Sequence, residues 1–239
     1  MTMLGSFRSR LAEMRLRLAN WRLTDDQRAD LRRREFTRIF STDAWNSPES
    51  VSGSGSTLGA TEALRPQLVK LFAELSIGSV LDAPCGDCNW MAALWPHLRL
   101  QRYVGIDIVE ALILRNRDRF QRPGVDFQVA DLCRDPMPEA QLVLCRDCLI
   151  HLSLGEARAA LANLSRSGTE WLLVSSDRGV RRNREVPTGS WRPIDLEVEP
   201  FSLPGPDRWI PYRTWTDGHR AISSGLGLWR AADVRRALG

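Results

Sequence analysis

Short apolar runs alternate with longer amphipathic stretches from about residue 58 to residue 176. The runs are short enough for buried strands, and the stretches between them carry apolar residues at helical spacing. The alternation favours a parallel sheet with right-handed crossovers and helices on both faces. Strands are predicted at residues 80–82, 103–107, 125–130, 142–145 and 171–175, and helices at residues 61–75, 90–98, 110–120 and 153–164.

The alternation fails near the end of the chain. Residues 177–220 contain six prolines and three of the nine tryptophans, with little periodicity. A long irregular stretch inside a compact domain is usually a functional loop or a lid, so we interpret residues 177–220 as a substrate loop. Residues 226–229 then predict a final strand, which a short terminal helix follows.

The N-terminal segment differs from the rest. Residues 9–40 are helical in pattern, with a capping box at Thr24–Gln27. Residues 41–57 lose this periodicity and become rich in Gly and Ser, which fits either a flexible linker or a loop that closes over a ligand. We expect a helical arm with a Gly/Ser loop at residues 1–57 and the main domain at residues 58–239. The predicted apolar face of the second helix comprises Leu31, Phe36, Ile39 and Phe40.

Composition bounds the class of protein. Of 239 residues, 43% are hydrophobic and 26% are charged, as expected for one globular domain with an appendage. No apolar run approaches a membrane span, and the N-terminus lacks the apolar core and cleavage site of a secretion signal. An odd set of five cysteines favours free thiols in a reducing compartment. We expect a cytoplasmic protein with no membrane partner, and the sequence leaves its oligomeric state open.

Positive charge is concentrated in the arm. Residues 1–40 hold ten Arg against five acidic residues, a net charge of +5, whereas the whole chain carries +4. Such an arm fits either a partner with phosphates or a solvated amphipathic helix. We expect the solvated helix and no nucleic-acid partner.

Three carboxylates close the first three predicted strands: Asp82, Asp107 and Asp131. In a parallel α/β sheet these strand ends line one crevice. A carboxylate after the second strand can bind both hydroxyls of a ribose, and one after the third can accept a hydrogen bond from an adenine amino group. Asp also ends strands merely to cap the next helix, but three in this register indicate a nucleoside-type cofactor.

The same stretches resemble the class I S-adenosylmethionine-dependent methyltransferases. The motifs that carry the resemblance, over about residues 36–239, are VLDAPCGD, YVGIDI, VADL and LVLCRDCLIHLS, with Phe40, Trp45 and the run SGSGS upstream. The resemblance implies a Rossmann-like α/β fold with a seven-stranded, mostly parallel sheet in the order 3-2-1-4-5-7-6 and an antiparallel strand 7. It also implies S-adenosyl-L-methionine as cofactor and S-adenosyl-L-homocysteine as product.

The loop after the first strand departs from the family pattern D-x-G-x-G-x-G. Pro84 and Cys88 replace two of the glycines, which argues against a dehydrogenase whose pyrophosphate needs close backbone approach. S-adenosylmethionine has no pyrophosphate, so the expected cofactor is unchanged. The resemblance implies that it is bound by Asp82, Cys85, Gly86, Asp107, Ile108, Asp131, Leu132 and Arg146.

His151 lies one helical turn after Asp147, just past the fourth strand. The resemblance places the transferred methyl group there, and an imidazole can take a proton from an acceptor hydroxyl near neutral pH. A lone His is more often a packed or surface residue, yet we expect His151 or Asp147 to be the proton acceptor. The expected acceptor is a small polar molecule, first a hydroxyl of a sugar, glycan or related metabolite and second an amine.

Aromatic and basic residues of the irregular segment are candidates for substrate contacts. Aromatic faces and Arg side chains suit sugars, aromatic rings and nucleobases alike, and the alternative is that they pack the loop onto the sheet. The candidates are Trp191, Arg192, Trp209 and Tyr212.

The sequence also allows three other interpretations of its function. The pairs Cys85/Cys88 and Cys145/Cys148 could hold zinc or form a redox pair, but zinc would fill the methionine end of the cofactor site, so we expect buried thiols and no metal. An RNA or protein acceptor is favoured by the Arg-rich arm and disfavoured because no N-P-P-Y-type motif follows the fourth strand. A non-catalytic cofactor-binding module is the other alternative, against which the intact Asp107 and Asp131 argue.

Overall fold

The structure is a computed structural model that describes residues 23–218 and 220–239. The predicted helix that begins at residue 9 lies outside the described residues, as does most of the charge of the arm. Within the described residues, no helix combines the length and the apolar character that crossing a bilayer requires.

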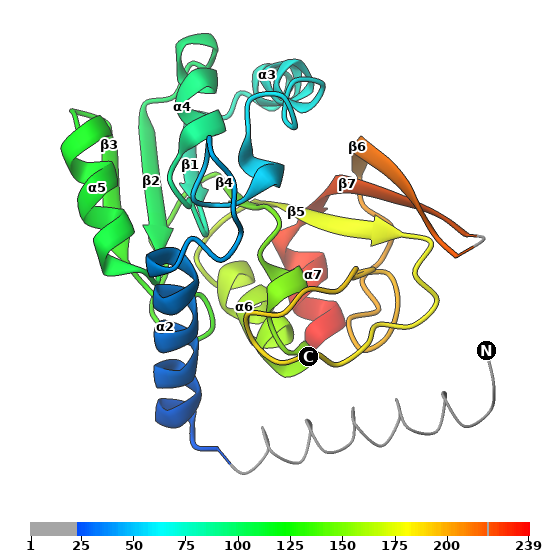
Figure 1. Cartoon of the computed structure of the whole chain (residues 1–239). Helices are drawn as coiled ribbons and strands as arrows, with labels where there is room; N and C mark the ends of the chain where they lie inside the picture. The colour runs from blue at the N-terminus through cyan, green and yellow to red at the C-terminus, as the bar shows by residue number, and fades with distance from the viewer. Residues whose placement is uncertain (1–22, 219) are drawn as a thin grey trace, which may run out of the picture.

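A single seven-stranded sheet forms the centre, in the order β3-β2-β1-β4-β5-β7-β6 (Figure 1). Neighbouring strands from β3 to β5 are parallel, whereas β7 is antiparallel to both β5 and β6. This is the predicted order, and it confirms the Rossmann-like α/β class. The strands are β1 (Ser79–Asp82), β2 (Arg102–Asp107), β3 (Val125–Val129), β4 (Leu142–Cys145), β5 (Trp171–Arg178), β6 (Arg208–Asp217) and β7 (Arg220–Arg230).

Helices cover both faces of the sheet because its central strands are apolar on both sides. Along β4, Val143 and Cys145 pack with α6 and α7, whereas Leu142 and Leu144 pack with α3, α4 and α5. Such strands are buried on both faces, as parallel sheets require. The helices are α2 (Asp25–Ser41), α3 (Leu64–Glu74), α4 (Asn89–Leu94), α5 (Glu110–Phe120), α6 (Leu154–Ser165) and α7 (Ala231–Leu238), with 3₁₀ turns η1 (Ser54–Ser56), η2 (Trp95–His97) and η3 (Leu149–His151).

Two helices begin at the capping boxes that the sequence predicts. The hydroxyl of Thr24 accepts from the backbone N–H of Gln27, and Ser153 does the same with Glu156. One residue of the predicted apolar face of α2 is wrong. Leu31 is 36% exposed, whereas Arg32 is only 5% exposed, because the guanidinium has buried ion-pair partners in the main domain.

The irregular segment is shorter than predicted. Residues 208–217 form β6, and β7 begins at residue 220, six residues before the predicted strand. Pro211 concealed β6 because proline interrupts a strand pattern. It is tolerated here at the edge of the sheet, where the register of β6 against β7 shifts between Pro211 and Arg213.

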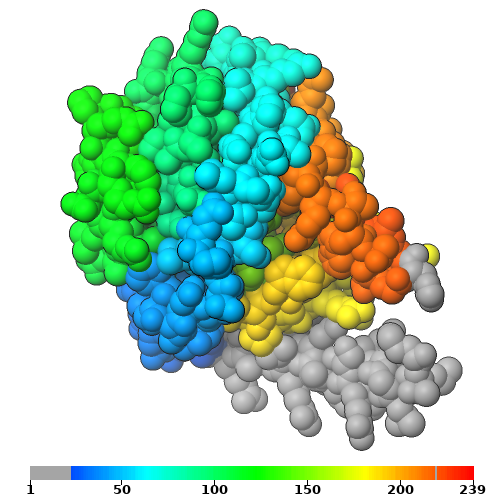
Figure 2. Space-filling view, turned by 45° about the horizontal axis from the view of Figure 1, so that its top comes forward, coloured from blue at the N-terminus to red at the C-terminus, as the bar shows by residue number. Residues whose placement is uncertain are grey.

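Helix α2 lies beyond the arrowhead of β2, at the carboxyl end of the parallel strands (Figure 1). In Figure 2 the blue residues of α2 and the segment that follows lie between green α5 and the yellow segment near residue 190. The chain that precedes the main domain therefore covers the edge of the sheet where the three strand-ending carboxylates lie.

Candidate functional site

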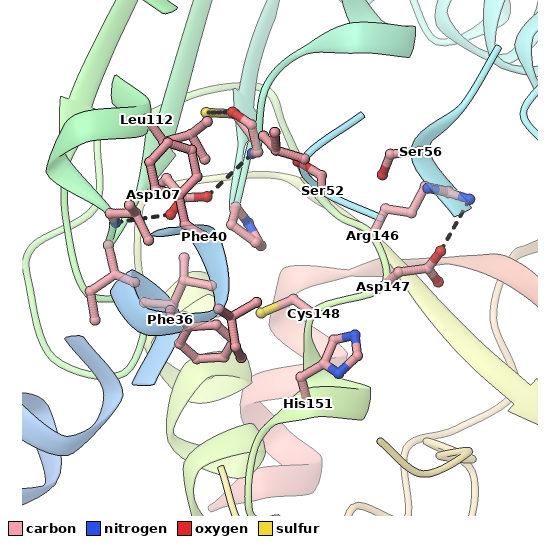
Figure 3. A pocket seen from close by; sticks show the side chains of 18 of the residues that line it. Phe36, Phe40, Ser52, Ser56, Asp107, Leu112, Arg146, Asp147, Cys148 and His151 are labelled. Carbon is pink, nitrogen blue, oxygen red and sulfur yellow. Dashed lines mark hydrogen bonds and ion pairs between the residues drawn. The ribbon is translucent and has the colours of Figure 1, made fainter. Parts of the chain in front are cut away.

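A cavity lies between the carboxyl ends of β1, β2 and β4 and the helix α2 (Figure 3). All the residues predicted to bind cofactor or to accept the proton line it. They are Asp82, Cys85, Gly86, Asp107, Ile108, Asp131, Leu132, Arg146, Asp147 and His151.

The Gly/Ser segment before the main domain is fixed against the loop that follows β1. Asp87 accepts hydrogen bonds from the Ser50 hydroxyl (3.0 Å), the Ser52 hydroxyl (3.2 Å) and the Val51 N–H (3.0 Å). Gly86 has a φ of +53°, and a Cβ there would collide with the Ser52 hydroxyl. The one glycine that remains of the family pattern is therefore required both by its backbone conformation and by this close approach.

Asp107 ends β2 and points into the cavity. Its carboxylate accepts from the backbone N–H groups of Val109 (3.0 Å) and Gly86 (3.3 Å), which leaves two of its roughly four acceptor directions open. Two open directions on one carboxylate match the two hydroxyls of a ribose, so this end of the cavity fits a nucleoside cofactor. Burial raises the pKa of Asp107 to about 6.

Asp82 ends β1 and lies deeper. The hydroxyl of Tyr103 donates to its carboxylate at 2.6 Å. Burial raises the pKa of Asp82 to about 7, although the hydrogen bond from Tyr103 and the positive charge of Arg146 act in the opposite direction. The cavity therefore contains two carboxyl groups that titrate near neutral pH, as functional sites often do.

Asp131, after β3, is 3% exposed and forms a buried ion pair with Arg32 of α2. A second arm of the same guanidinium lies 3.0 Å from Glu156 at the start of α6. Burial alone lowers the pKa of Arg32, but the hydrogen bonds and charges of these partners raise it above its ordinary value. The cation is therefore held charged between two carboxylates.

Helix α2 also supplies an apolar side of the cavity, which sequence reasoning did not assign to the site. The signal was partly present, since Phe36, Ile39 and Phe40 were predicted to share the apolar face of this helix. What they pack against was not predictable from the helix alone. The lining residues absent from the predicted set include Arg32, Phe36, Ile39, Phe40, Trp45, Val51, Ser52, Ser56, Trp90, Leu112 and Cys148.

Arg146 and Asp147 follow β4 on the opposite side of the cavity from Asp107 (Figure 3). The Arg146 guanidinium donates to the Gly55 carbonyl (2.9 Å) and pairs with Asp147 (3.1 Å). Asp147 accepts a further hydrogen bond from the Tyr212 hydroxyl of β6 (2.8 Å). One chain of contacts thus joins the Gly/Ser segment, the end of β4 and the edge strand.

His151 ends the turn η3 beside this chain of contacts. Its Nδ1 lies 3.0 Å from the Ser190 carbonyl oxygen, and its ring centroid is 5.1 Å from that of Trp45. Burial lowers the pKa of His151, and the Ser190 carbonyl acts in the opposite direction. Asp147 contacts Tyr212 and Arg146 rather than the imidazole.

The four predicted substrate residues do not line the cavity. Arg192 is buried and donates to the carbonyls of Arg184 and Leu149. Its guanidinium therefore holds two backbone segments together. Trp209 lies under the Arg178 guanidinium on the outer strand. Trp191 is 50% exposed, and Tyr212 contacts two lining residues, Asp147 through its hydroxyl and Arg146 through its ring.

All five cysteines are free, and three of them line the cavity. A hydrogen bond with Cys145 and burial raise the pKa of the Cys148 thiol, and burial raises that of Cys85. Both thiols are therefore protonated at neutral pH. Among the described residues, no three His, Cys, Asp or Glu side chains are grouped as a metal site.

Comparison with known proteins gives a match to one domain model. A family model described as a methyltransferase domain matches residues 80–168, from β1 through α6. No curated protein sequence matches the chain.

Several solved structures share the fold at low sequence identity. The N-methyltransferase NodS from Bradyrhizobium japonicum WM9, in complex with S-adenosyl-L-homocysteine, is 14% identical over 81% of this chain and 97% of that chain, with a TM-score of 0.56. The N-terminal domain of EvdMO1 is 16% identical over 82% of this chain and 96% of that chain, with a TM-score of 0.51. Human N-acetylserotonin methyltransferase is 16% identical over 80% of this chain and 59% of that chain, with a TM-score of 0.50.

At these identities the neighbours establish the fold, and the family model establishes the domain. The strand order, with β7 antiparallel between β5 and β6, agrees with both. Residues 80–168 therefore match a methyltransferase domain, and the sheet as a whole has the order of the Rossmann-like methyltransferase fold.

Proposed function

We propose that this methyltransferase acts on a hydroxyl of a small polar molecule and that Nε2 of His151 accepts the hydroxyl proton. One observation carries the proposal: His151 lines the cavity while its Nδ1 lies 3.0 Å from the Ser190 carbonyl oxygen. A carbonyl only accepts hydrogen bonds, so Nδ1 carries the hydrogen and Nε2 keeps its lone pair.

Bound S-adenosylmethionine supplies a methyl group on a sulfonium, which is already a good leaving group. The tasks left to the protein are to align the acceptor and to remove its proton. Burial lowers the pKa of His151, so the imidazole is neutral at pH 7 and ready to accept. The Ser190 carbonyl then stabilises the imidazolium, as an oriented acceptor does for other catalytic histidines.

Asp147 is the weaker candidate for the proton acceptor. Its two oxygens are engaged by the Tyr212 hydroxyl and the Arg146 guanidinium. Both contacts occupy lone pairs that would otherwise be open to a proton of the acceptor. We assign Asp147 the task of orienting Arg146 and Tyr212 at the acceptor side of the cavity.

The proposed cofactor contacts follow from the positions around the cavity. The open acceptor directions of Asp107 support hydrogen bonds to the ribose hydroxyls, and Asp131 lies where it can accept from the adenine amino group. Ile108 and Leu132 follow these two carboxylates and supply apolar contacts to the base. The methionine end lies toward the loop after β1, near Asp82, Cys85, Gly86 and Arg146.

A small acceptor is supported by the covering of the cavity. The segment that includes Trp45, Val51 and Ser52 and the helix α2 both lie over the strand ends, and such covering suits a molecule that can be enclosed. A sugar hydroxyl is the first class to test, since one neighbour of this fold was crystallised with S-adenosylhomocysteine and D-fucose. The five free thiols support a cytoplasmic location.

The test is a methylation screen with purified protein and sugars, sugar nucleotides, polyols and amines as acceptors. With an acceptor in hand, we expect His151→Ala to lower kcat by roughly 100-fold or more with nearly unchanged cofactor affinity. His97→Ala provides the matched control, because His97 is an exposed histidine outside the cavity. Normal turnover of His151→Ala would refute the assignment, and turnover on amines alone would refute the hydroxyl acceptor.

A further inference from the structure

Arg32 is the most deeply buried basic side chain contributed by α2. It lies outside the main domain predicted at residues 58–239. Its Nη2 lies 2.6 Å from Oδ2 of Asp131, and its Nε contacts both oxygens at 3.0 and 3.1 Å. A guanidinium that faces a carboxylate with two nitrogens fixes its orientation as well as its charge. The plane of the Asp131 carboxylate is therefore set by α2.

The hydrogen bonds to Asp131 do not fill it. Besides the two guanidinium nitrogens, the backbone N–H of Cys133 donates to Oδ1 at 2.9 Å. These three N–H groups make four contacts, because Nε of Arg32 is shared between the two oxygens. Three donor hydrogens for about four acceptor directions leave one direction of the carboxylate. Since Asp131 lines the cavity, the remaining direction is available to a donor inside it.

Arg32 is itself anchored on its far side. Its Nη1 donates to Glu156 Oε1 at 3.0 Å, while the other oxygen of Glu156 accepts from the backbone N–H and the hydroxyl of Ser153. Thr188 donates to the same oxygen. The guanidinium is thus held between two carboxylates, and one of them is fixed by the first turn of α6.

We propose that Arg32 is a positioning residue of the cofactor site, which keeps Asp131 oriented so that its remaining acceptor direction meets the adenine amino group. The inference rests on the proposed contact between Asp131 and adenine. It adds that recognition of the base depends on a helix upstream of the methyltransferase domain. The apolar residue Phe36, one turn further along α2, lines the cavity beside this contact.

The test compares two nucleosides that differ at the amino group. S-adenosyl-L-homocysteine and S-inosyl-L-homocysteine are titrated calorimetrically into the full chain; the inosyl compound has a carbonyl oxygen in place of the amino group. We expect the wild type to prefer the adenosyl compound by about tenfold or more, since a hydrogen bond to a charged acceptor is lost. Arg32→Met and Asp131→Asn should both bring the ratio of the two Kd values to within about threefold of one.

Two further variants separate positioning from structural support. Arg32→Lys keeps the charge but loses the two-pronged contact, so we expect an intermediate ratio. Arg33→Met removes an exposed guanidinium from the next position of α2, so we expect the wild-type ratio. Thermal unfolding establishes that each variant is folded, and if Arg32→Met is not, the ratio for Arg32→Lys decides.

Three results would overturn the inference. If Arg32→Met raises the Kd of both compounds by the same factor, so that the ratio of the two Kd values is unchanged, Arg32 has only a structural role. If Asp131→Asn keeps the wild-type ratio, Asp131 does not recognise the amino group, and Arg32 cannot act through it. If the wild type binds neither compound, the cofactor site itself is misplaced, and the role of Arg32 falls with it.

Discussion

The Nδ1 atom of His151 lies 3.0 Å from the carbonyl oxygen of Ser190. This contact fixes the tautomer of the imidazole. It also fixes the orientation of the ring, because Ser190 belongs to the irregular segment after β5. Backbone hydrogen bonds from Gly189 to His151 and from Arg192 to Ile150 hold the two segments together. The irregular segment therefore orients the catalytic candidate rather than lying apart from it.

The pH dependence of turnover follows from this environment. Burial lowers the pKa of His151 below its ordinary value of 6.5, so the imidazole should be neutral and competent above that lowered value and protonated below it. We expect kcat/KM to rise with pH to a plateau, with the midpoint of the rise below the ordinary value of about 6.5. Rate measurements from pH 5 to 9 check this, and a limb centred well above pH 7 would contradict it.

The two tyrosines of the chain allow a matched comparison, because each donates its hydroxyl to a carboxylate of the cavity. Tyr212 donates to Asp147 at the acceptor side, and Tyr103 donates to Asp82 under the loop after β1. We expect Tyr212→Phe to lower kcat/KM for the acceptor about tenfold with little effect on cofactor affinity. Tyr103→Phe should instead weaken S-adenosylhomocysteine binding. Equal effects of both substitutions on both quantities would argue against separate cofactor and acceptor sides.

Asp87 should control the segment over the cavity. Its carboxylate receives hydrogen bonds from Ser50, Val51 and Ser52, so Asp87→Ala removes the acceptor that holds all three. We expect faster proteolysis between residues 41 and 57 and a loss of about 1–3 kcal/mol in the free energy of unfolding. Asp118→Ala, on the exposed side of α5, is the control. Unchanged proteolysis in Asp87→Ala would show that other contacts hold the segment.

Two buried carboxyl groups predict how stability depends on pH. Burial raises the pKa of Asp82 to about 7 and that of Asp107 to about 6, so the folded chain binds more protons than the unfolded chain between about pH 4 and pH 7. Stability without ligand should therefore fall as pH rises through this range. Asp82→Asn should make this fall smaller between denaturant titrations at pH 5 and pH 8. A stability that falls as steeply in Asp82→Asn as in the wild type would contradict the burial of an ionisable Asp82.

Much of the site was predictable because its residues follow strands. Asp82 and Asp107 end two parallel strands and Asp131 follows a third, and parallel strands bring their carboxyl ends to one edge. Arg32 was not predictable, because its partners Asp131 and Glu156 lie 99 and 124 residues away in sequence. An Arg in an Arg-rich helix is expected to face solvent, and only packing of α2 on the domain reverses that expectation.

The predicted substrate residues do not line the cavity, for a related reason. Trp191, Arg192 and Trp209 have side chains suited to ligands, but side-chain chemistry alone does not say which way a residue faces. Arg192 donates to backbone carbonyls, and Trp209 lies on β6, a strand that was not predicted because Pro211 interrupts its sequence pattern. Loop and edge positions depend on tertiary contacts, so the sequence indicated the cofactor better than the acceptor.

The most direct measurement is calorimetric titration of S-adenosyl-L-homocysteine into the wild type, Asp107→Asn and Asp118→Asn at pH 8. Asp107 is ionised there, and its two open acceptor directions face the cavity. We predict one site per chain, an affinity lowered by about 1–3 kcal/mol in Asp107→Asn, and an unchanged affinity in Asp118→Asn. Wild-type affinity in Asp107→Asn, or no binding to the wild-type chain, would contradict a cofactor site at the ends of β1 and β2.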